Sequence, residues 1–97
     1  MTTTRPKAEP TVLIDNDRCL ATEWRFAPGA ETGWHRHGMD YVVVPMTTGK
    51  LLLEEPGGTS RTADLTAGRP YARDEGVEHN VVNANAFEFV FIEIEMK

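Results

Sequence analysis

The sequence predicts an all-β fold, either a small barrel or a sandwich. Turn-forming clusters interrupt the chain roughly every eight to twelve residues, a spacing that is typical of such folds. The clearest clusters are Asp15-Asn16-Asp17, Pro28-Gly29 and Pro56-Gly57-Gly58. No segment repeats apolar residues with the helical period of about 3.6 residues between helix caps. The 97 residues suffice for one domain with one core.

Short runs of β-branched, aromatic or alternating residues lie between these turns, and we expect each run to form a strand. The clearest run is 19–26, in which Leu20, Thr22, Trp24 and Phe26 share one face. In chain order the expected strands are 12–14, 19–26, a segment around His35 and His37, 41–44, 50–55, 59–65, 70–73, 79–83 and 87–95.

Pro45 ends the run 41–44 and has no N–H to donate to a neighbouring strand. We therefore expect a β-bulge or a bend over residues 45–47. Such an irregularity absorbs an extra residue without reversing the buried face of the strand.

The last expected strand is apolar on both faces. Its two faces carry Phe87, Phe89 and Phe91 on one side and Val90, Ile92, Ile94 and Met96 on the other. A strand with one wet face carries polar residues there, so we expect the core to cover one face and a second chain to cover the other. A barrel of this length also has little core to spare. We therefore expect a homodimer whose interface includes the first strand or residues 87–96.

The charge balance is acidic, with a net charge of −5 and a sequence pI of about 5.1. This balance argues against nucleic acid or an anionic membrane as a partner. Cys19 is the only cysteine, so no intramolecular disulfide can form and nothing indicates an oxidising compartment. We expect Cys19 to be a packed residue rather than a nucleophile.

Residues 1–10 contain threonine, proline and charged residues but no apolar segment of a signal peptide. We expect them to form a flexible N-terminal leader, because they cannot bury enough apolar surface to offset the entropy of ordering. The single domain is then expected to span residues 11–97, with regular structure beginning near Val12. We expect a cytoplasmic protein.

The three histidines of the chain are arranged as expected for a metal site. His35 and His37 are two residues apart, so on a strand their imidazoles point to the same side. His79 begins a later expected strand. Three imidazoles that converge on one point are a plausible ligand set for a divalent metal ion. The expected partner is a small molecule bound beside that ion.

Two motifs resemble those of the cupins, a family of double-stranded β-helix (jelly-roll) barrels. The first cupin motif joins a Gly, a His-x-His pair, a Glu and a second Gly at set intervals. Its glycine and histidine positions are occupied here by Gly29, His35, His37 and Gly49.

The second cupin motif is also present, with one departure. Its glycine, histidine and asparagine positions are occupied by Gly68, Gly76, His79 and Asn83, and Asp74 stands where the family has Pro. The runs TGWHRH and EHNVVNA further resemble small, single-domain, RmlC-like cupins associated with β-alanine degradation. The resemblance covers residues 29–83, implies a cupin jelly roll and places every histidine at a ligand position.

The chain departs from the first motif at its carboxylate ligand. Tyr41 or Val42 stands where the family has Glu, and the nearest acid is Asp40, one position earlier. If Tyr41 occupies the ligand position, Asp40 points to the opposite face of the strand. The metal set then resembles that of three-His cupin dioxygenases, which act on thiols and β-diketones. If the loop Gly38-Met39 shifts the register, Asp40 completes a His₃Asp site.

The resemblance implies a divalent metal ion, with Fe(II) favoured and Zn, Ni or Mn as alternatives. Tyr41 is the candidate catalytic residue, because a phenol near the metal can hydrogen-bond a bound ligand or close the pocket. Trp34 and Arg36 alternate with the histidines, so we expect a packed Trp and a solvated Arg that face away from the site.

Three arginines, Arg25, Arg69 and Arg73, are candidates for a bidentate contact with a substrate carboxylate. A surface position is the commoner role for any one of them. Asn83 is expected to hydrogen-bond the backbone near the His79 strand rather than a substrate.

Three functions are compatible with these features, because one fold hosts many chemistries. The first is a non-haem iron dioxygenase or related oxygenase that acts on a small polar or carboxylate metabolite, with His35, His37 and His79 as a facial set. The second is a non-catalytic module that binds a metal or a small molecule. The third is a metal-assisted isomerase or lyase with Tyr41 or Asp40 as the base.

Overall fold

The computed structural model describes residues 4–97, and the regular structure of these residues is β apart from one short 3₁₀ helix, Pro56–Gly58. The strands, in chain order, are β1 (Glu9–Asp15), β2 (Cys19–Phe26), β3 (His35–Arg36), β4 (Tyr41–Pro45), β5 (Gly49–Glu55), β6 (Thr59–Leu65), β7 (Tyr71–Arg73), β8 (Glu78–Asn83) and β9 (Phe89–Met96). The all-β prediction is confirmed. In the described part of the chain, no helix has the length and apolar character needed to cross a membrane.

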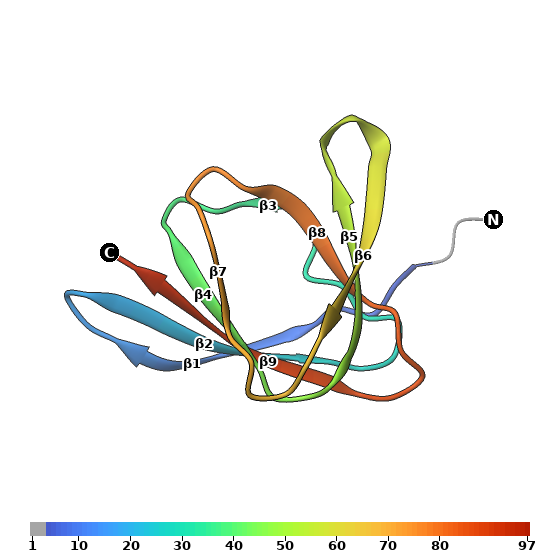
Figure 1. Cartoon of the computed structure of the whole chain (residues 1–97), viewed down its shortest axis with the longest axis horizontal. Helices are drawn as coiled ribbons and strands as arrows, with labels where there is room; N and C mark the ends of the chain where they lie inside the picture. Colours follow the sequence, from blue (N-terminus) through green and yellow to red (C-terminus); the bar gives the residue numbers. More distant parts are fainter. Residues whose placement is uncertain (1–3) are drawn as a thin grey trace.

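Two sheets face each other and enclose the core (Figure 1). One has five strands in the order β1-β2-β9-β4-β7, and the other has four in the order β3-β8-β5-β6. All pairs of named strands are antiparallel. The C-terminal strand β9 lies between β2 and β4, so the five-stranded sheet joins strands from the two halves of the chain.

The expected strands are recovered to within a few residues, and β2 and β6 have the expected bounds. The turn between β5 and β6 depends on its glycines, since Gly57 and Gly58 have φ values of 84° and 77°, which side chains rarely adopt. β5 and β6 pair from Gly49 opposite Leu65 to Glu55 opposite Thr59, which is the antiparallel return that the turn predicts.

The core fills the space between the sheets. Phe26 and Phe91 pack against each other within it, with ring centroids 5.4 Å apart. The other buried members are aliphatic or aromatic, and they are Ala8, Ala30, Tyr41, Val43, Leu51, Leu53, Leu65, Val81 and Phe89. Burial of this apolar surface is the main stabilising contribution to the fold.

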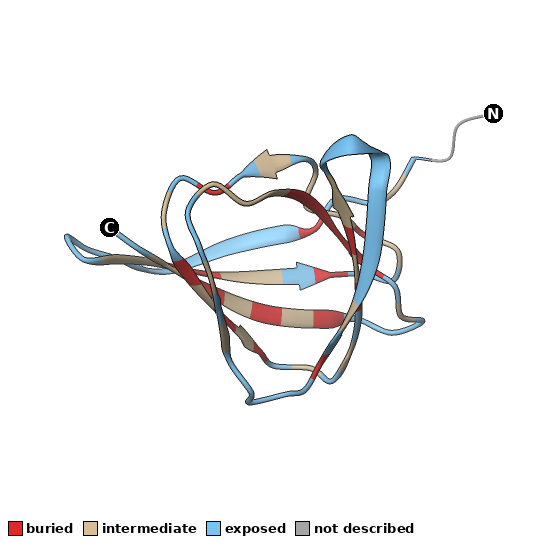
Figure 2. Cartoon of the chain, turned by 45° about the horizontal axis from the view of Figure 1, so that its top comes forward, coloured by how far each residue is buried: buried red, intermediate tan, exposed pale blue. Residues whose placement is uncertain are grey.

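The two faces of β9 differ in burial more than the sequence indicates. Buried and half-buried residues alternate along the strand (Figure 2), and Phe89 and Phe91 lie on the buried face. Glu93 continues that face and is only 9% exposed. Phe87, expected within the strand, lies before it and is exposed, because β9 begins at Phe89.

The expected leader includes residues that belong to the barrel. β1 begins at Glu9 rather than near Val12, and Ala8 is buried in the core. The N–H of Ala8 donates to the carbonyl of Glu31, and the N–H of Glu31 donates to the carbonyl of Pro6. The leader prediction is therefore wrong for residues 5–10, because backbone pairing orders a segment with few apolar side chains. Residues 1–3 lie outside the described residues.

The irregularity expected after Tyr41–Pro45 is present. The ladder of β4 ends at Pro45, and Met46 and Thr47 form a bend before β5 begins at Gly49. The bend is held by the N–H of Met46, which donates to the carbonyl of Val90. The buried residues Tyr41, Val43 and Pro45 therefore keep one face.

Candidate metal centre

Three imidazoles converge where β3 pairs with β8. His35 lies directly opposite His79 in the antiparallel register, and His37 follows the end of β3. The Nε2 atom of His37 lies 3.0 Å from the Nε2 of His35 and 3.0 Å from the Nε2 of His79. The ligand atoms of the three histidines lie within 4.8 Å of one another. The structure thus brings together the three residues that the motifs indicate.

The backbone of His37 is held by the turn that precedes β8. Its N–H donates to the carbonyl of Val77, and its carbonyl accepts from the N–H of Gly76. Gly76 has a φ of 97°, so the turn requires glycine. The second motif therefore fixes His37 as well as His79.

The second ring nitrogen of His35 has a defined partner. Its Nδ1 lies 2.8 Å from the carbonyl oxygen of Gly33, which can only accept a hydrogen bond. His35 therefore carries its proton on Nδ1, and its Nε2 lone pair faces the other two rings. The Nδ1 atoms of His37 and His79 make no hydrogen bond to a described residue.

Burial keeps the other two imidazoles neutral. It lowers the pKa of His79 to about 3 and the pKa of His37 to about 4, and the charges of His35 and Arg73 add to both effects. A neutral imidazole is the form that ligates a metal.

The nitrogen spacing fits an ion. Three nitrogens that bind one ion at roughly 2.1 Å and at right angles lie about 3.0 Å apart, whereas tetrahedral angles would separate them by about 3.4 Å. The two distances of 3.0 Å from Nε2 of His37 match the right-angled arrangement. The donor set therefore fits a divalent ion held by the three histidines.

Tyr41 lies against the triad on the core side. Its ring stacks on His37, and its hydroxyl is buried without a hydrogen-bond partner among the described residues. Burial raises the pKa of Tyr41 to about 12, so the hydroxyl stays protonated at neutral pH. It can donate a hydrogen bond to a ligand, and it is a poor base. It borders an enclosed cavity of about 20 Å³ that His79 also lines, which is room for roughly one water molecule.

Asp40 does not reach the triad. It is exposed, and its Oδ1 accepts the N–H of Glu75 at 2.8 Å. β4 begins at Tyr41 with that side chain inward, so the register places Asp40 away from the site. The alternative of a His₃Asp site is therefore wrong.

The expectation that Trp34 is packed is also wrong, because Trp34 is 54% exposed. Arg36 is exposed as expected, but it lines an open hollow together with His35 and His37.

Glu93 and Glu95 are acidic residues near the triad that the motifs do not indicate. One carboxylate oxygen each from Glu93 and Glu95 and one nitrogen of His37 lie within 4.8 Å of one another. Burial raises the pKa of Glu93 to about 7, with Glu95 adding to the effect. The signal in the sequence is the alternation Phe89, Phe91, Glu93, which carries an acid onto the buried face of β9.

The three candidate arginines have different surroundings. Arg25 is exposed and pairs with Glu88 and Glu23, and Arg69 is exposed. Arg73 is half-buried, lines the enclosed cavity beside His79 and has no ion pair with a described residue.

Asn83 has the structural role that we expected. It is buried, and its Nδ2 donates to the carbonyls of Phe26, Ala27 and Phe87. These contacts join the end of β8 to the loops on either side, so the side chain is not available to a substrate.

Comparison with curated proteins gives a relative that matches almost end to end. The chain is 64% identical over 93 residues to the beta-alanine degradation protein BauB of Pseudomonas aeruginosa, covering 96% of this chain and 97% of the relative. No protein-family model matches the chain.

Solved structures share the fold. A cupin domain from Bordetella pertussis Tohama I superposes with a TM-score of 0.95 at 67% identity, covering 99% of each chain. A cupin superfamily protein from Desulfitobacterium hafniense superposes with a TM-score of 0.72 at 14% identity, covering 99% of this chain and 83% of the other. The second likeness concerns the fold alone. The architecture implied by the two motifs is the architecture of these structures.

Proposed function

The chain belongs to the cupin family, in the group of the BauB protein, and from this premise we propose that it is a metal-dependent enzyme of the non-haem iron oxygenase type. The proposed substrate is a small polar or carboxylate metabolite. The observation that carries the proposal is the convergence of His35, His37 and His79, with Nε2 spacings of 3.0 Å.

The three histidines would hold the ion. Iron suits neutral imidazole ligands, and zinc, nickel or manganese could occupy the same donor set. A divalent iron held by these three residues would supply redox chemistry with dioxygen. The Nδ1–H of His35, fixed by Gly33, keeps the Nε2 lone pair of that ring directed at the point where the three rings converge.

The hollows beside the triad support a small substrate. An open hollow of about 260 Å³ lies along β9, lined by Trp24, Thr32, His35, Arg36, His37, Glu93 and Glu95. This volume is below the usual range for drug-sized ligands, so it suits a metabolite of few atoms. On the core side, the cavity that Arg73 lines has room for roughly one water molecule, so the open hollow is the space that a substrate would occupy. The name of the relative refers to the degradation of β-alanine, a small amino acid with one carboxylate.

The proposal is tested by loading the protein with iron under argon and then measuring oxygen uptake. The panel of substrates contains small thiols, β-diketones and short carboxylates, including β-alanine. We expect uptake with one of these classes in the wild type and none in His79→Ala. Asp40→Asn is the matched control and keeps wild-type uptake, because an amide oxygen can still accept the N–H of Glu75.

Two results would reject an oxygenase. Stoichiometric iron without oxygen uptake and without turnover would favour a non-catalytic binding module. Substrate-dependent exchange of protons with deuterated solvent, without oxygen uptake, would favour a metal-assisted isomerase or lyase. One observation supports that second candidate, namely the buried Glu93 carboxyl beside His37, which is better placed as a base than Asp40 or Tyr41.

A further inference from the structure

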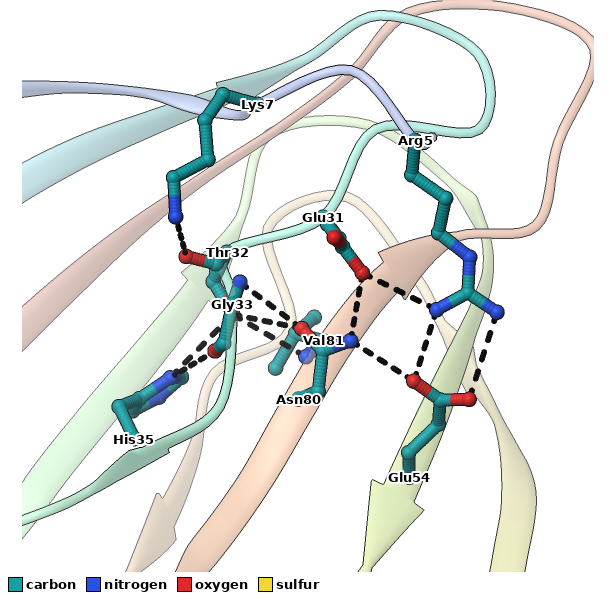
Figure 3. Close-up of polar contacts among 9 residues, drawn as sticks. All are labelled: Arg5, Lys7, Glu31, Thr32, Gly33, His35, Glu54, Asn80 and Val81. Carbon is teal, nitrogen blue, oxygen red and sulfur yellow. Dashed lines mark hydrogen bonds and ion pairs between the residues drawn. The ribbon is translucent and has the colours of Figure 1, made fainter. Parts of the chain in front are cut away.

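A buried asparagine joins the two segments that supply the ligands. Asn80 directly follows His79 on β8 and is 7% exposed. Its Oδ1 accepts the N–H of Gly33 at 2.9 Å, and its Nδ2 donates to Oε1 of Glu31 and to Oε1 of Glu54, both at 2.8 Å (Figure 3). Every polar atom of the Asn80 side chain therefore has a partner.

These partners allow only one orientation of the amide. The two carboxylates can only accept hydrogen bonds, so Nδ2 must face them and Oδ1 must face the N–H of Gly33. A flipped amide would place its oxygen against two carboxylates. Gly33 is thus held by its N–H, and its carbonyl accepts from Nδ1 of His35 at 2.8 Å (Figure 3). The orientation of Asn80 is linked to the proton position of His35 through a single residue.

Arg5 balances the two carboxylates. Its Nη1 lies 3.1 Å from Oε1 of Glu31 and 2.8 Å from Oε1 of Glu54, and its Nη2 lies 3.4 Å from Oε2 of Glu54. Without this guanidinium, two like charges would face each other across one amide, which raises the cost of keeping both ionised. The contacts with Arg5 and Asn80 lower the pKa of both carboxyls, so both are acceptors at neutral pH.

The N-terminal segment delivers Arg5 to this position. Pro6 and Ala8 exchange backbone hydrogen bonds with Glu31. The Nζ of Lys7 donates to the carbonyl of Thr32 at 3.0 Å (Figure 3). Residues 5–8 therefore run beside the loop that leads to His35, and they hold that loop from the side opposite to β8.

We propose that Asn80, oriented by Arg5 through Glu31 and Glu54, is a positioning residue that fixes the Nδ1–H tautomer and ring orientation of His35. The consequence of this positioning is a ligand set that is organised before the ion binds, and this consequence rests on the proposed metal centre. Partners behind a metal-bound histidine typically contribute about 10-fold to 100-fold in metal affinity. The segment that the sequence predicts to be a flexible leader thereby supports the metal centre.

The test compares Asn80→Ala and Arg5→Ala with Arg25→Ala. Arg25 also bridges two carboxylates, Glu23 and Glu88, but on an exposed surface without contact to the His35 loop. The first readout is the pair of imidazole ¹⁵N chemical shifts of His35 in metal-free protein, which report its tautomer. The second is the dissociation constant for Zn²⁺, measured by competition with a chromophoric chelator. The urea midpoint of each metal-free variant is recorded as a measure of stability.

In the wild type and in Arg25→Ala we expect the Nδ1–H tautomer and equal Zn²⁺ affinity. In Asn80→Ala we expect a mixture of tautomers and an affinity weaker by about 10-fold, the lower end of the range for a direct partner, because Asn80 acts on His35 through Gly33. Arg5→Ala shifts both readouts in the same direction by a smaller factor. Arg5→Lys restores part of the loss, because an ammonium replaces the charge but not the fork that spans two carboxylates.

The proposal is overturned if the folded variants keep the wild-type tautomer and Zn²⁺ affinity, even when their urea midpoints fall, because the network would then serve stability alone. If Asn80→Ala does not fold, Arg5→Ala decides, since Arg5 is partly exposed and outside the core. Absence of Zn²⁺ binding in the wild type would reject the metal centre, while the tautomer measurement would still decide whether Asn80 positions His35.

Discussion

The phenol ring of Tyr41 lies parallel to the imidazole of His37, with ring centroids 3.8 Å apart and ring planes inclined by 14°. The stack sets the plane of the His37 ring, while the backbone bonds to Gly76 and Val77 set its position. The ring of Tyr41 is thus a structural part of the site, and its hydroxyl is separable from that role. The hydroxyl is buried and lacks a partner among the described residues.

Tyr41→Phe is therefore expected to leave the free energy of unfolding unchanged, to within about 1 kcal/mol, or to raise it. Removal of an unsatisfied buried polar group releases its desolvation penalty, and the stack on His37 is kept. Substrate turnover should fall if Tyr41 is the catalytic residue that the sequence predicts, because the variant cannot donate a hydrogen bond to a bound ligand. Urea denaturation and oxygen uptake measure the two effects. A loss of more than about 2 kcal/mol would mean that the hydroxyl has a partner in the folded protein.

His79→Ala is expected to abolish stoichiometric metal while leaving a folded barrel, because the core does not depend on an ion. Asp40→Asn should retain the metal of the wild type, since Asp40 contacts Glu75 and not the triad. Elemental analysis after purification in parallel gives the metal content, and circular dichroism checks the fold. Equal metal in the wild type and in His79→Ala would show that the ligand set is wrong.

Much of the barrel could be predicted from local chemistry. The alternation of side chains between two faces predicts strand β2. Pro56 and the two glycines that follow it predict the β5–β6 hairpin, because turn formation depends on a few adjacent residues. The triad could be predicted because His35 and His37 alternate on one segment and the cupin motifs include His79. These features depend on spacing that is visible in the sequence.

The remaining features depend on contacts between distant segments. Arg5 is ordered by Glu31 and Glu54, which are 26 and 49 residues away, so no local pattern marks it. Asp40 lies outside the triad because β4 begins at Tyr41 with that side chain inward. A shift of the strand register by one residue would reverse the two faces. Glu93 could have been placed on the buried face by alternation, but its approach to His37 requires the pairing of β9 between β2 and β4.

Asn83→Ala is expected to lower the free energy of unfolding by about 3 kcal/mol, because three backbone carbonyls lose a buried donor. Asn16→Ala is the matched control. Asn16 also bonds two backbone groups, the N–H groups of Arg18 and Cys19, but in an exposed turn where water replaces it, so the expected loss is about 1 kcal/mol or less. Urea denaturation of both variants checks the difference, and equal losses would contradict it.

The metal-free protein is expected to lose stability as the pH falls from about 6.5 to 4.5. The folded-state pKa values of His37 and His79 are lowered to about 4 and about 3, so in this window the unfolded chain binds two protons that the folded chain does not. Glu93 opposes them with one group, since its folded-state pKa is raised to about 7 and the folded chain holds its proton. Because two imidazoles lower the stability on acidification and one carboxyl raises it, the free energy of unfolding decreases as the pH falls.

Well above pH 6.5, Glu93 is the one group of these three that still holds its proton in the folded chain but not in the unfolded chain. Stability should therefore decline as the pH rises through about 7. Glu93→Gln is expected to remove this decline and to steepen the loss between pH 6.5 and 4.5. Urea midpoints of chelator-treated protein across the pH range provide the measurement. A midpoint that is constant or rises from pH 6.5 to 4.5 would contradict the buried, neutral state of the two histidines.

The protein is expected to be a homodimer that uses the free edge and apolar side chains of β1. This strand is the edge of the five-stranded sheet, and the hairpin it forms with β2, drawn in blue, extends from the barrel (Figure 1). Its side chains Val12, Leu13 and Ile14 are 60%, 49% and 50% exposed. An unprotected apolar edge strand favours pairing with another chain, and a small barrel gains core by doing so.

Light scattering at micromolar concentration should therefore give twice the chain mass of 10.8 kDa. The double variant Val12→Lys/Ile14→Lys should give the single-chain mass, because two like charges at a closely packed interface oppose association. Thr62→Lys places the same charge on β6, the edge of the other sheet, and should remain dimeric. A wild type of single-chain mass would reject the dimer, and a dimeric double variant would move the interface away from β1.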